Sequence, residues 1–536
     1  MRAVVRSLPG TALLGLLCCA ASASAQVQPY GTGTPAAFSG SIDSGGRLPF
    51  VGSPFFGLRL VGAPNPLVSV AFVCANPASI PIGGVVFLVD PSSAALLGIP
   101  GGQTVLSLPI PSDAALAGAK AYAQVAVVDP ALPMGFGLTN GLEVGVFPDP
   151  TPTRATFGIQ DHSPGGTAPG GLAVLDLTTT PPSFRATGPI GFSGPLSVNF
   201  SPKIAVADAA GIAFALGNDT VNGFVRALDV SSDPIGVVTY PVLGDTPVAL
   251  PISSTVGWRD LEVTSDGALL FVTSGGTSPA QEGLLEVFDV AGVSSGAPGT
   301  LMQSISFPAA GGGPLGLDLA PDDASLALVT GADLHPPLSL YAVDPASPAP
   351  LAAVASFALA GFALGPYPND VHFAPDASLL FVTGGNGTFA VIDATTSPPS
   401  VSIDGGSWPV MQTSSVHGSA VAVMGGTLVG IVGDAPTTGG ALYSVVDLNQ
   451  VSPSYGAVVG SFTTNLGGNI SNHRIHARGS IVVAVDGTAP PILSQLLDVI
   501  DLDGPPLFLS WRIQTPSTTS LVPAGVTSIP RDFDLH

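Results

Sequence analysis

Short apolar runs separated by clusters of Pro, Gly, Asn and Asp predict β-strands along most of the chain. Before residue 148 six such runs can be recognised, at 55–62, 67–75, 84–90, 103–110, 120–129 and 141–147. Alternating strands and turns at this density are typical of a β-sandwich. The Pro-rich stretch PDPTPTR that follows reads as a linker. We therefore expect a β-sandwich domain over 26–148 and a second domain over 149–536.

The second domain contains a repeat in which an apolar strand ends in aspartate. Successive copies lie 53, 60, 55, 49, 54 and 54 residues apart, ending at Asp176, Asp229, Asp289, Asp344, Asp393, Asp447 and Asp501. A repeat of about 54 residues that contains several short strands is typical of a β-propeller blade. The spacing therefore predicts an all-β fold with seven blades.

A longer phrase recurs within the same domain. It reads RDLEVTSDGALLFVTSGG at 259–276, GLDLAPDDASLALVTGAD at 316–333 and NDVHFAPDASLLFVTGGN at 369–386. Each copy predicts an innermost strand, a tight turn and a second strand. The phrase resembles the repeats of seven-bladed lactonase-like and YVTN-repeat propellers, and the resemblance covers residues 154–536. It implies architecture strongly and chemistry weakly.

The chain ends on RDFDLH, the first half of that phrase. The second domain opens at RATFGIQD, which matches a second strand with no first strand before it. A propeller whose first blade lacked a strand would expose an open sheet edge. We therefore expect the C-terminal strand to become the innermost strand of the first blade and to close the ring.

The N-terminus has the pattern of an export signal. Arg2 and Arg6 precede a short apolar core, and Ala23-Ser24-Ala25 is a small-residue cleavage motif. We expect residues 1–25 to be removed and the mature protein to be secreted, to the periplasm or the extracellular space. PYGTGTP at 29–35 resembles the start of a small β-rich module found on secreted bacterial proteins of unknown role. Cys74 is then the one remaining cysteine, which excludes an internal disulfide.

The charge composition limits the class of partner. The chain has 14 Lys and Arg against 36 Asp and Glu, a net charge of −22, and no basic cluster. We therefore expect no binding to nucleic acid. The longest apolar run beyond the signal, at 420–433, is broken by paired glycines, so we also expect no membrane insertion after signal cleavage.

Polar residues concentrate where the innermost strands are predicted to start, at one mouth of the propeller channel. These candidates for ligand binding are Trp258, Arg259, Asp260, Asp370, His417, His473, Arg474, Arg531 and Asp532. The competing interpretation is that polar residues at strand ends only satisfy backbone groups and cap turns. Asp266, Asp322 and Asp376 lie in tight turns, for which that structural interpretation is favoured. It is also favoured for the strand-ending aspartates, because they recur in every repeat.

Two other kinds of site were considered at the same mouth. Carboxylate and amide oxygens around a channel suit Ca²⁺ or Mg²⁺, although no cofactor is specified by the sequence. Trp258 and Trp408 precede innermost strands and could stack on a sugar, with hydrophobic packing as the alternative.

The sequence supports two functional hypotheses. The first is a secreted propeller that binds a small molecule, a glycan or a protein without catalysis, because no catalytic motif is recognisable. The second is a lactonase-like hydrolase, in which polar residues at the channel mouth, with or without a divalent metal, activate water. A catalytic site requires three or four such groups at one point, and their arrangement decides between the two.

Overall fold

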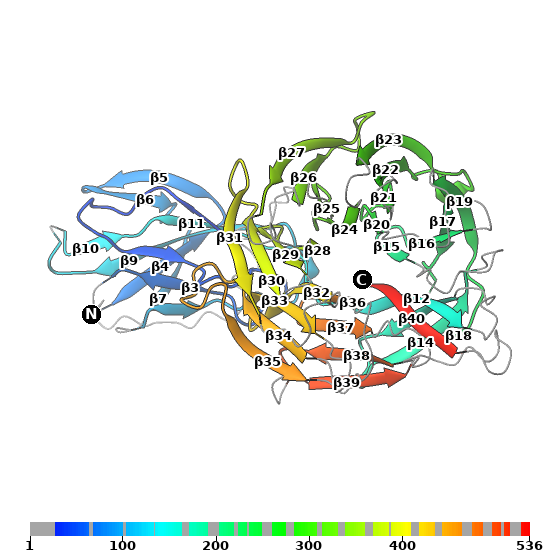
Figure 1. Ribbon diagram of the computed structural model, residues 1–536. Helices are drawn as coiled ribbons and strands as arrows, with labels where there is room; N and C mark the ends of the chain where they lie inside the picture. The colour runs from blue at the N-terminus through cyan, green and yellow to red at the C-terminus, as the bar shows by residue number, and fades with distance from the viewer. Residues whose placement is uncertain are drawn as a thin grey trace. The chain divides into compact units, whose positions relative to one another are not determined.

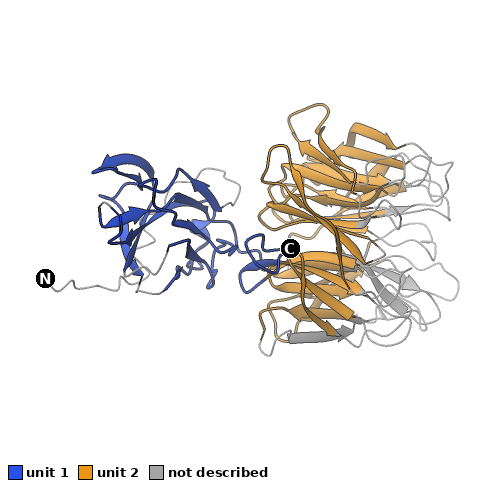
Figure 2. Cartoon of the chain, turned by 60° about the vertical axis from the view of Figure 1, so that its left-hand side comes forward, with its two compact units in different colours: residues 1–150, 424–428, 448–455 blue, residues 151–423, 429–447, 456–536 orange. Residues whose placement is uncertain are grey.

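The computed structural model describes most of the chain, with gaps. The described residues are 27–63, 68–99, 103–132, 134–162, 171–190, 203–218, 223–232, 235–248, 260–274, 283–307, 314–330, 338–359, 368–384, 387–408, 418–434, 442–463, 474–485, 496–504, 509–514 and 527–535. The predicted signal peptide lies outside them. The chain divides into two compact units (Figure 2): residues 1–150 with 424–428 and 448–455 form unit 1, and the remainder forms unit 2.

Within these ranges the protein is all-β, and its only helical segments are two 3₁₀ turns, Ala114–Leu116 and Val293–Ser295. No helix among the described residues is long and apolar enough to cross a membrane.

Unit 1 contains three sheets among its described residues. The largest has the order β1-β11-β9-β4-β7 with β10 on β9, the second is β2-β3-β8, and the third is β5-β6. The strands are β1 (Val27–Tyr30), β2 (Ser41–Asp43), β3 (Gly57–Val61), β4 (Ser69–Cys74), β5 (Pro77–Ile82), β6 (Val85–Val89), β7 (Ala95–Ile99), β8 (Val105–Ser107), β9 (Lys120–Val128), β10 (Phe136–Leu138) and β11 (Gly141–Gly145).

The first two sheets of unit 1 share a hydrophobic core. Ile42 and Leu58 of the small sheet belong to the same buried cluster as Ala71, Val125 and Leu142 of the large one. The alternation along β4, in which Ser69, Ala71 and Val73 are buried and Val70 and Phe72 are half-buried, places one face of the strand on that core. Cys74 is buried in the strand that the sequence predicted.

Unit 2 is a series of antiparallel sheets, six of four strands and one of five among the described residues, which is a β-propeller arrangement. In chain order, its described strands are β12 (Arg154–His162), β13 (Gly171–Asp176), β14 (Ser183–Pro189); β15 (Lys203–Ala207), β16 (Ile212–Asn218), β17 (Gly223–Asp229), β18 (Gly236–Val237), β19 (Val242–Val248); β20 (Leu261–Val263), β21 (Leu269–Ser274), β22 (Gly283–Asp289), β23 (Thr300–Phe307); β24 (Pro314–Leu319), β25 (Ser325–Thr330), β26 (Leu338–Val343), β27 (Leu351–Phe357); β28 (Pro368–Phe373), β29 (Leu379–Gly384), β30 (Thr388–Asp393), β31 (Ser400–Ser407); β32 (Gly418–Met424), β33 (Thr427–Asp434), β34 (Leu442–Asp447), β35 (Val458–Thr463); β36 (Arg474–Arg478), β37 (Ile481–Val485), β38 (Leu496–Asp501), β39 (Leu509–Gln514); and β40 (Thr527–Leu535).

The sheets of unit 2 pack face to face around a common centre. Figure 1 shows β15, β20, β24, β28 and β36 towards the middle and β19, β23, β27, β35 and β39 towards the outside. Neighbouring sheets share buried clusters: Phe271 and Leu285 pack with Leu317 and Leu328, and Val329 belongs with residues of β28 to β30 in the next cluster. The second and third strands of each sheet are apolar along most of their length because neighbouring sheets cover both of their faces.

The C-terminal strand completes the sheet that the start of unit 2 begins. β40 pairs antiparallel with β12, so that Phe157 lies opposite Phe533 and Gly158 opposite Asp532, with a register shift after Gly158. Leu535 is buried in one cluster with Ala155 and Phe157. The sheet order is β18-β14-β13-β12-β40, in which the β14–β18 pairing is parallel. The predicted pairing of the C-terminal strand RDFDLH with RATFGIQD, the first strand of unit 2, is therefore confirmed.

The aspartate that ends the third strand of each repeat forms a turn. Where the described bonds include it, the carboxylate accepts the N–H of the residue two positions later, as in Asp229 with Ser231, Asp289 with Ala291 and Asp393 with Thr395. These bonds hold the connection to the outermost strand. Asp266, Asp322 and Asp376 make the equivalent bond in the turns after the innermost strands. The structural interpretation favoured for both sets agrees with these contacts.

Candidate functional site

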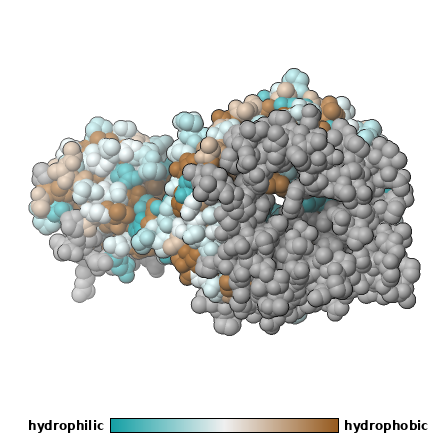
Figure 3. Space-filling view, in the orientation of Figure 1, coloured by the Kyte–Doolittle hydropathy of each residue, from teal (hydrophilic) through white to brown (hydrophobic). Residues whose placement is uncertain are grey.

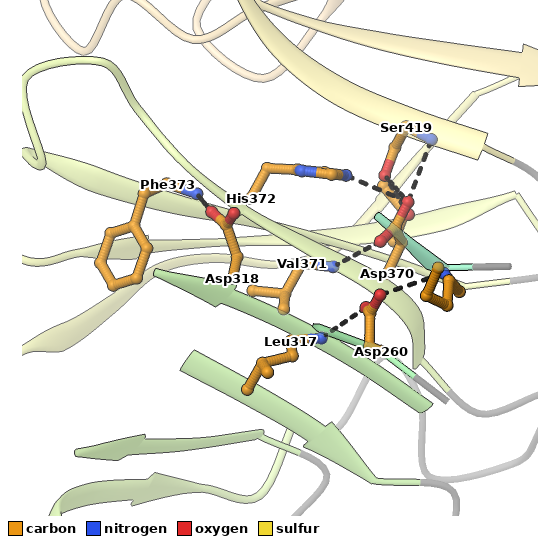
Figure 4. A network of polar contacts seen from close by, with 10 residues as sticks. Asp260, Leu317, Asp318, Asp370, Val371, His372, Phe373 and Ser419 are labelled. Carbon is orange, nitrogen blue, oxygen red and sulfur yellow. Dashed lines mark hydrogen bonds and ion pairs between the residues drawn. The ribbon is translucent and has the colours of Figure 1, made fainter. Parts of the chain in front are cut away.

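The innermost strands of unit 2 carry a chain of buried polar contacts that runs from sheet to sheet (Figure 4). Lys203 of β15 places Nζ 3.0 Å from Oδ1 of Asp260, the residue before β20. The other oxygen of Asp260 accepts the backbone N–H of Leu317 in β24, at 3.1 Å. Asp260 therefore joins three neighbouring innermost strands.

Asp370 has the same role two sheet boundaries further on, between β28 and β32. Its Oδ2 accepts both the N–H and the hydroxyl of Ser419 in β32, each at 3.3 Å. The Ser419 hydroxyl also lies 2.8 Å from that of Thr383 in β29. Nε2 of His372, two residues along β28, lies 3.0 Å from the same Asp370 oxygen. Asp370 and His372 lie on one side of the strand because side chains alternate.

Asp318 of β24 binds β28 from the sheet on its other side, since Oδ2 of Asp318 accepts the backbone N–H of Phe373 in β28. Burial raises the pKa of Asp318, as do the charges of Asp370 and Asp260, whereas the charge of His372 and the Phe373 N–H lower it. The balance raises this pKa to about 7. Desolvation is the dominant cause, as expected for a carboxyl group removed from water.

The pKa of His372 is raised, whereas burial lowers the pKa of a typical histidine. Burial by itself lowers its pKa, but the charges of Asp370, Asp318 and Asp260 and the contact with Asp370 raise it to about 9. The ring of His476 in β36 faces it edge-on, with centroids 6.2 Å apart. His372 is therefore positively charged at neutral pH, and it lies between carboxylates from two sheets.

Asp534 closes this pattern at the other end of the chain. Its Oδ2 accepts the N–H of Val206 in β15, at 2.7 Å, so β40 is tied to the following sheet as well as to β12. Arg478 at the end of β36 donates to the carbonyl of Leu535 at 3.0 Å. Acidic residues on innermost strands therefore repeatedly bind the backbone of the next innermost strand.

The mouth residues predicted from sequence are only partly described. The side chains of Asp260 and Asp370 are placed, and both take part in the network above. Arg474 lies at the start of β36, and Arg531 and Asp532 lie in β40, with their backbones described but not their side chains. Trp258, Arg259, His417 and His473 lie outside the described residues. Whether the nine residues gather at one point stays a prediction.

Trp408 is a packing residue in this structure. Its side chain is buried and its ring stacks on Phe389 at 6.3 Å between centroids. It is therefore not available for the sugar platform considered from the sequence.

The described part of the chain contains no group of three or more His, Cys, Asp or Glu side chains with the geometry to hold a metal ion. Asp260, Asp318 and Asp370 direct their oxygens at backbone N–H groups and at neighbouring polar side chains. A Ca²⁺ or Mg²⁺ site built from the mouth residues stays a prediction. In Figure 3 the described residues visible among the grey atoms of unit 2 are both hydrophobic and hydrophilic.

Sequence reasoning missed Lys203, Asp318, His372, His476, Ser419 and Asp534. A signal for half of them was present, because aligning the repeated phrase on its turn places Glu262, Asp318, His372 and Asp534 at one position, two residues after Asp260, Gly316, Asp370 and Asp532. Two residues along a strand is the spacing of one face. The partner Val206 carries no such signal, because the contact uses its backbone N–H, and Ser419 lies outside the aligned phrases.

Comparison with known proteins gives only distant similarities. No family model and no curated protein matches the chain. Among solved structures, a protein from Lactobacillus plantarum is 15% identical with a TM-score of 0.48, over 72% of this chain and 100% of its own. Sqt1 from Chaetomium thermophilum, bound to the N-terminus of ribosomal protein L10, is 18% identical with a TM-score of 0.36, over 59% of this chain and 74% of its own. These values assign no activity to the chain.

Proposed function

We propose that the chain is a secreted, seven-bladed β-propeller with an N-terminal β-sandwich, and that it binds a ligand or partner without catalysing a reaction. The seven successive sheets described between β12 and β40, and the core shared by two sheets of unit 1, support this architecture. The export pattern of residues 1–25 supports secretion.

The use of the inner-strand carboxylates is the observation that carries the non-catalytic part of the proposal. Both oxygens of Asp260 are engaged, one by Lys203 and one by the N–H of Leu317. A general base must be free to reach the proton of its substrate. Carboxylates that hold neighbouring strands together favour a structural role over a catalytic one. We assign ligand binding to the mouth side chains Arg259, His473, Arg531 and Asp532.

A glycan array and a small-molecule library tested with purified residues 26–536 provide the direct experiment. We expect at least one ligand whose binding is weakened by Asp532→Ala and by Arg259→Ala, while Asp289→Ala, in a turn at the opposite ends of the strands, binds as the parent does. Each variant is first matched to the parent by melting temperature. Ligands that bind equally to all three variants would contradict a site at the mouth.

A lactonase-like hydrolase is the second candidate, and the Asp370–His372 pair is the observation that favours it. Displaced pKa values and a buried acid–imidazole contact are found at catalytic sites as well as in structural networks. A panel of lactones and aryl esters, assayed with and without EDTA and millimolar Ca²⁺ or Mg²⁺, separates the two. Turnover that Asp370→Asn abolishes without unfolding the protein would replace the binding proposal, and an absence of turnover supports it.

A further inference from the structure

The group formed by Asp318, Asp370, His372 and Ser419, hereafter the inner-strand cluster, spans two sheet boundaries. Asp318 of β24 holds the N–H of Phe373 in β28, and Asp370 of β28 holds the N–H of Ser419 in β32. Between the two carboxylates lies the imidazole of His372, with Nε2 3.0 Å from Asp370. One imidazole therefore lies beside two acids that each bind a different neighbouring strand.

We propose that the inner-strand cluster is a proton-dependent junction: while it holds its protons it keeps β24, β28 and β32 together, and their loss as the pH rises loosens the ring at these two boundaries. The proposal concerns the cohesion of the propeller and does not depend on whether the protein binds a ligand.

The surroundings of His372 give the direction of the effect. Among described residues, the charged or titratable groups around it are Asp318 from β24, Asp370 from its own strand, Asp260 directly before β20, and His476 from β36. β32 contributes the uncharged Ser419, and Lys203 of β15 is paired with Asp260. Acids therefore dominate around the imidazole, and the positive form is stabilised.

Three charge states follow for Asp318, Asp370 and His372 taken together. With the pKa of Asp318 raised to about 7 and that of His372 to about 9, the trio carries no net charge in mild acid. It carries one negative charge near pH 8, and two above pH 9. Two buried carboxylates without a cation repel each other in a medium that screens poorly.

The sign of the linkage is the same for both groups. Each has a folded-state pKa above its unfolded value, so the folded state binds more protons and stability falls as pH rises. The contribution of His372 is complete below its unfolded pKa of about 6.5 and is lost as pH approaches 9. That of Asp318 falls earlier, from about pH 4 to pH 7.

Amide hydrogen exchange at single residues tests the proposal on the full mature chain. The reporters are the N–H groups of Phe373 and Ser419, which the cluster binds, and the internal control is the N–H of Val290, which donates to the carbonyl of Ala268 within the sheet of β20 to β23. Protection factors corrected for intrinsic exchange report local opening. Between pH 7 and 9 we expect protection of the reporters to fall relative to Val290, by up to about tenfold per pH unit for one linked proton.

Two variants separate the two protons. In His372→Gln the decline between pH 7 and 9 should disappear and protection should be low throughout. In Asp318→Asn the decline between pH 4 and 7 should disappear. Should His372→Gln fail to fold, the parent and Asp318→Asn still decide the matter. A constant ratio of reporter to control in the parent, or an unchanged slope in either folded variant, overturns the proposal.

Discussion

Lys203 and Asp260 form an ion pair across a sheet boundary, with Nζ 3.0 Å from Oδ1 and side chains only 6% and 15% exposed. In a chain with 14 basic residues, one of two lysines is committed to this contact. A buried pair gains little over a hydrophobic alternative, but a single member left behind is expensive. The pair therefore makes each sheet dependent on its neighbour.

Asp260→Ala should destabilise the protein more than its loss of volume explains. It removes the carboxylate that pairs with the buried Lys203 and the acceptor of the Leu317 N–H. We expect a loss of about 3–5 kcal/mol, measured by urea unfolding. Asp245→Ala is the matched control, because the carboxylate of Asp245 is 42% exposed in its pair with Arg226 and should cost about 1 kcal/mol or less. Equal losses in the two variants would contradict this account.

The repeat in the sequence was sufficient to predict the all-β fold and the pairing of β40 with β12. The periodicity of apolar residues shows which side chains lie on each face of a strand, and an unpaired strand edge at each end of unit 2 is covered when the two end strands pair with each other. Strand lengths were less predictable. RDLEVTS was expected to be a strand from Arg259, whereas β20 contains only Leu261–Val263. Five strands of unit 1 were missed. The apolar residues of β5 and β7 are exposed or interrupted by proline, and β1, β2 and β10 have only three or four residues.

Gly430 of β33 allows its own sheet to pack closely against the neighbouring sheet that contains β29. A Cβ at this position would lie 2.8 Å from Cζ of Phe381, a fully buried ring in β29 of the neighbouring sheet. Because a packed aromatic ring yields little, Gly430→Ala should cost about 1–3 kcal/mol. Gly460→Ala, in β35 of the same sheet, meets nothing within 4 Å and should be neutral or slightly stabilising. Thermal unfolding of the two variants measures the difference, and a Gly430→Ala protein that melts with the parent would contradict the tight approach.

Asp176 is a strand-ending aspartate that pairs with an arginine. It is largely buried, accepts bonds from the N–H and hydroxyl of Thr178, and pairs with Arg185 at 3.1 Å. Burial alone would raise its pKa, but these partners outweigh it and lower the pKa. Its stabilising contribution is therefore present above about pH 4 and is lost as pH falls through the lower folded-state pKa.

Asp176→Asn should consequently lower stability near pH 7 by about 1.5–3 kcal/mol, the value of hydrogen bonds to a charged group. The deficit should shrink as the pH is lowered below 4. Asp289→Asn is the control, since Asp289 is exposed and is described with one turn bond, to Ala291. Unfolding curves recorded from pH 7 to pH 2.5 give the comparison. A deficit for Asp176→Asn that is constant over this range would show that the charge is unimportant.

The site was less predictable than the fold. Asp260 and Asp370 were selected because they begin the repeated phrase, and both take part in the network. Their partners were invisible to the same reasoning, because Leu317 and Ser419 contribute backbone N–H groups that any residue has. His372 lies in the quoted phrase NDVHFAPD, yet its proximity to Asp318 depends on how adjacent sheets pack, which no local pattern encodes.

The closing strand β40 gives the most severe expected change. Deleting residues 529–536 removes Leu535 from its cluster with Ala155 and Phe157, and removes the Asp534 contact to the N–H of Val206. One buried leucine and the lost hydrogen bonds together cost on the order of 5 kcal/mol, which is comparable to the net stability of many domains. The exposed edge of β12 would in addition invite aggregation. We expect an insoluble protein or one with a much lower melting temperature.

Point variants within β40 separate closure from binding. Leu535→Ala should lower stability by about 2–4 kcal/mol, and Asp534→Asn should weaken the junction with β15 because a neutral amide oxygen is a poorer acceptor for the Val206 N–H than a carboxylate. Asp532→Ala should leave the melting temperature nearly unchanged and weaken ligand binding. Removal of residues 1–25 should have no effect on melting. A truncated protein that melts with the mature chain would mean that β40 contributes nothing to the cohesion of the ring, despite its pairing with β12.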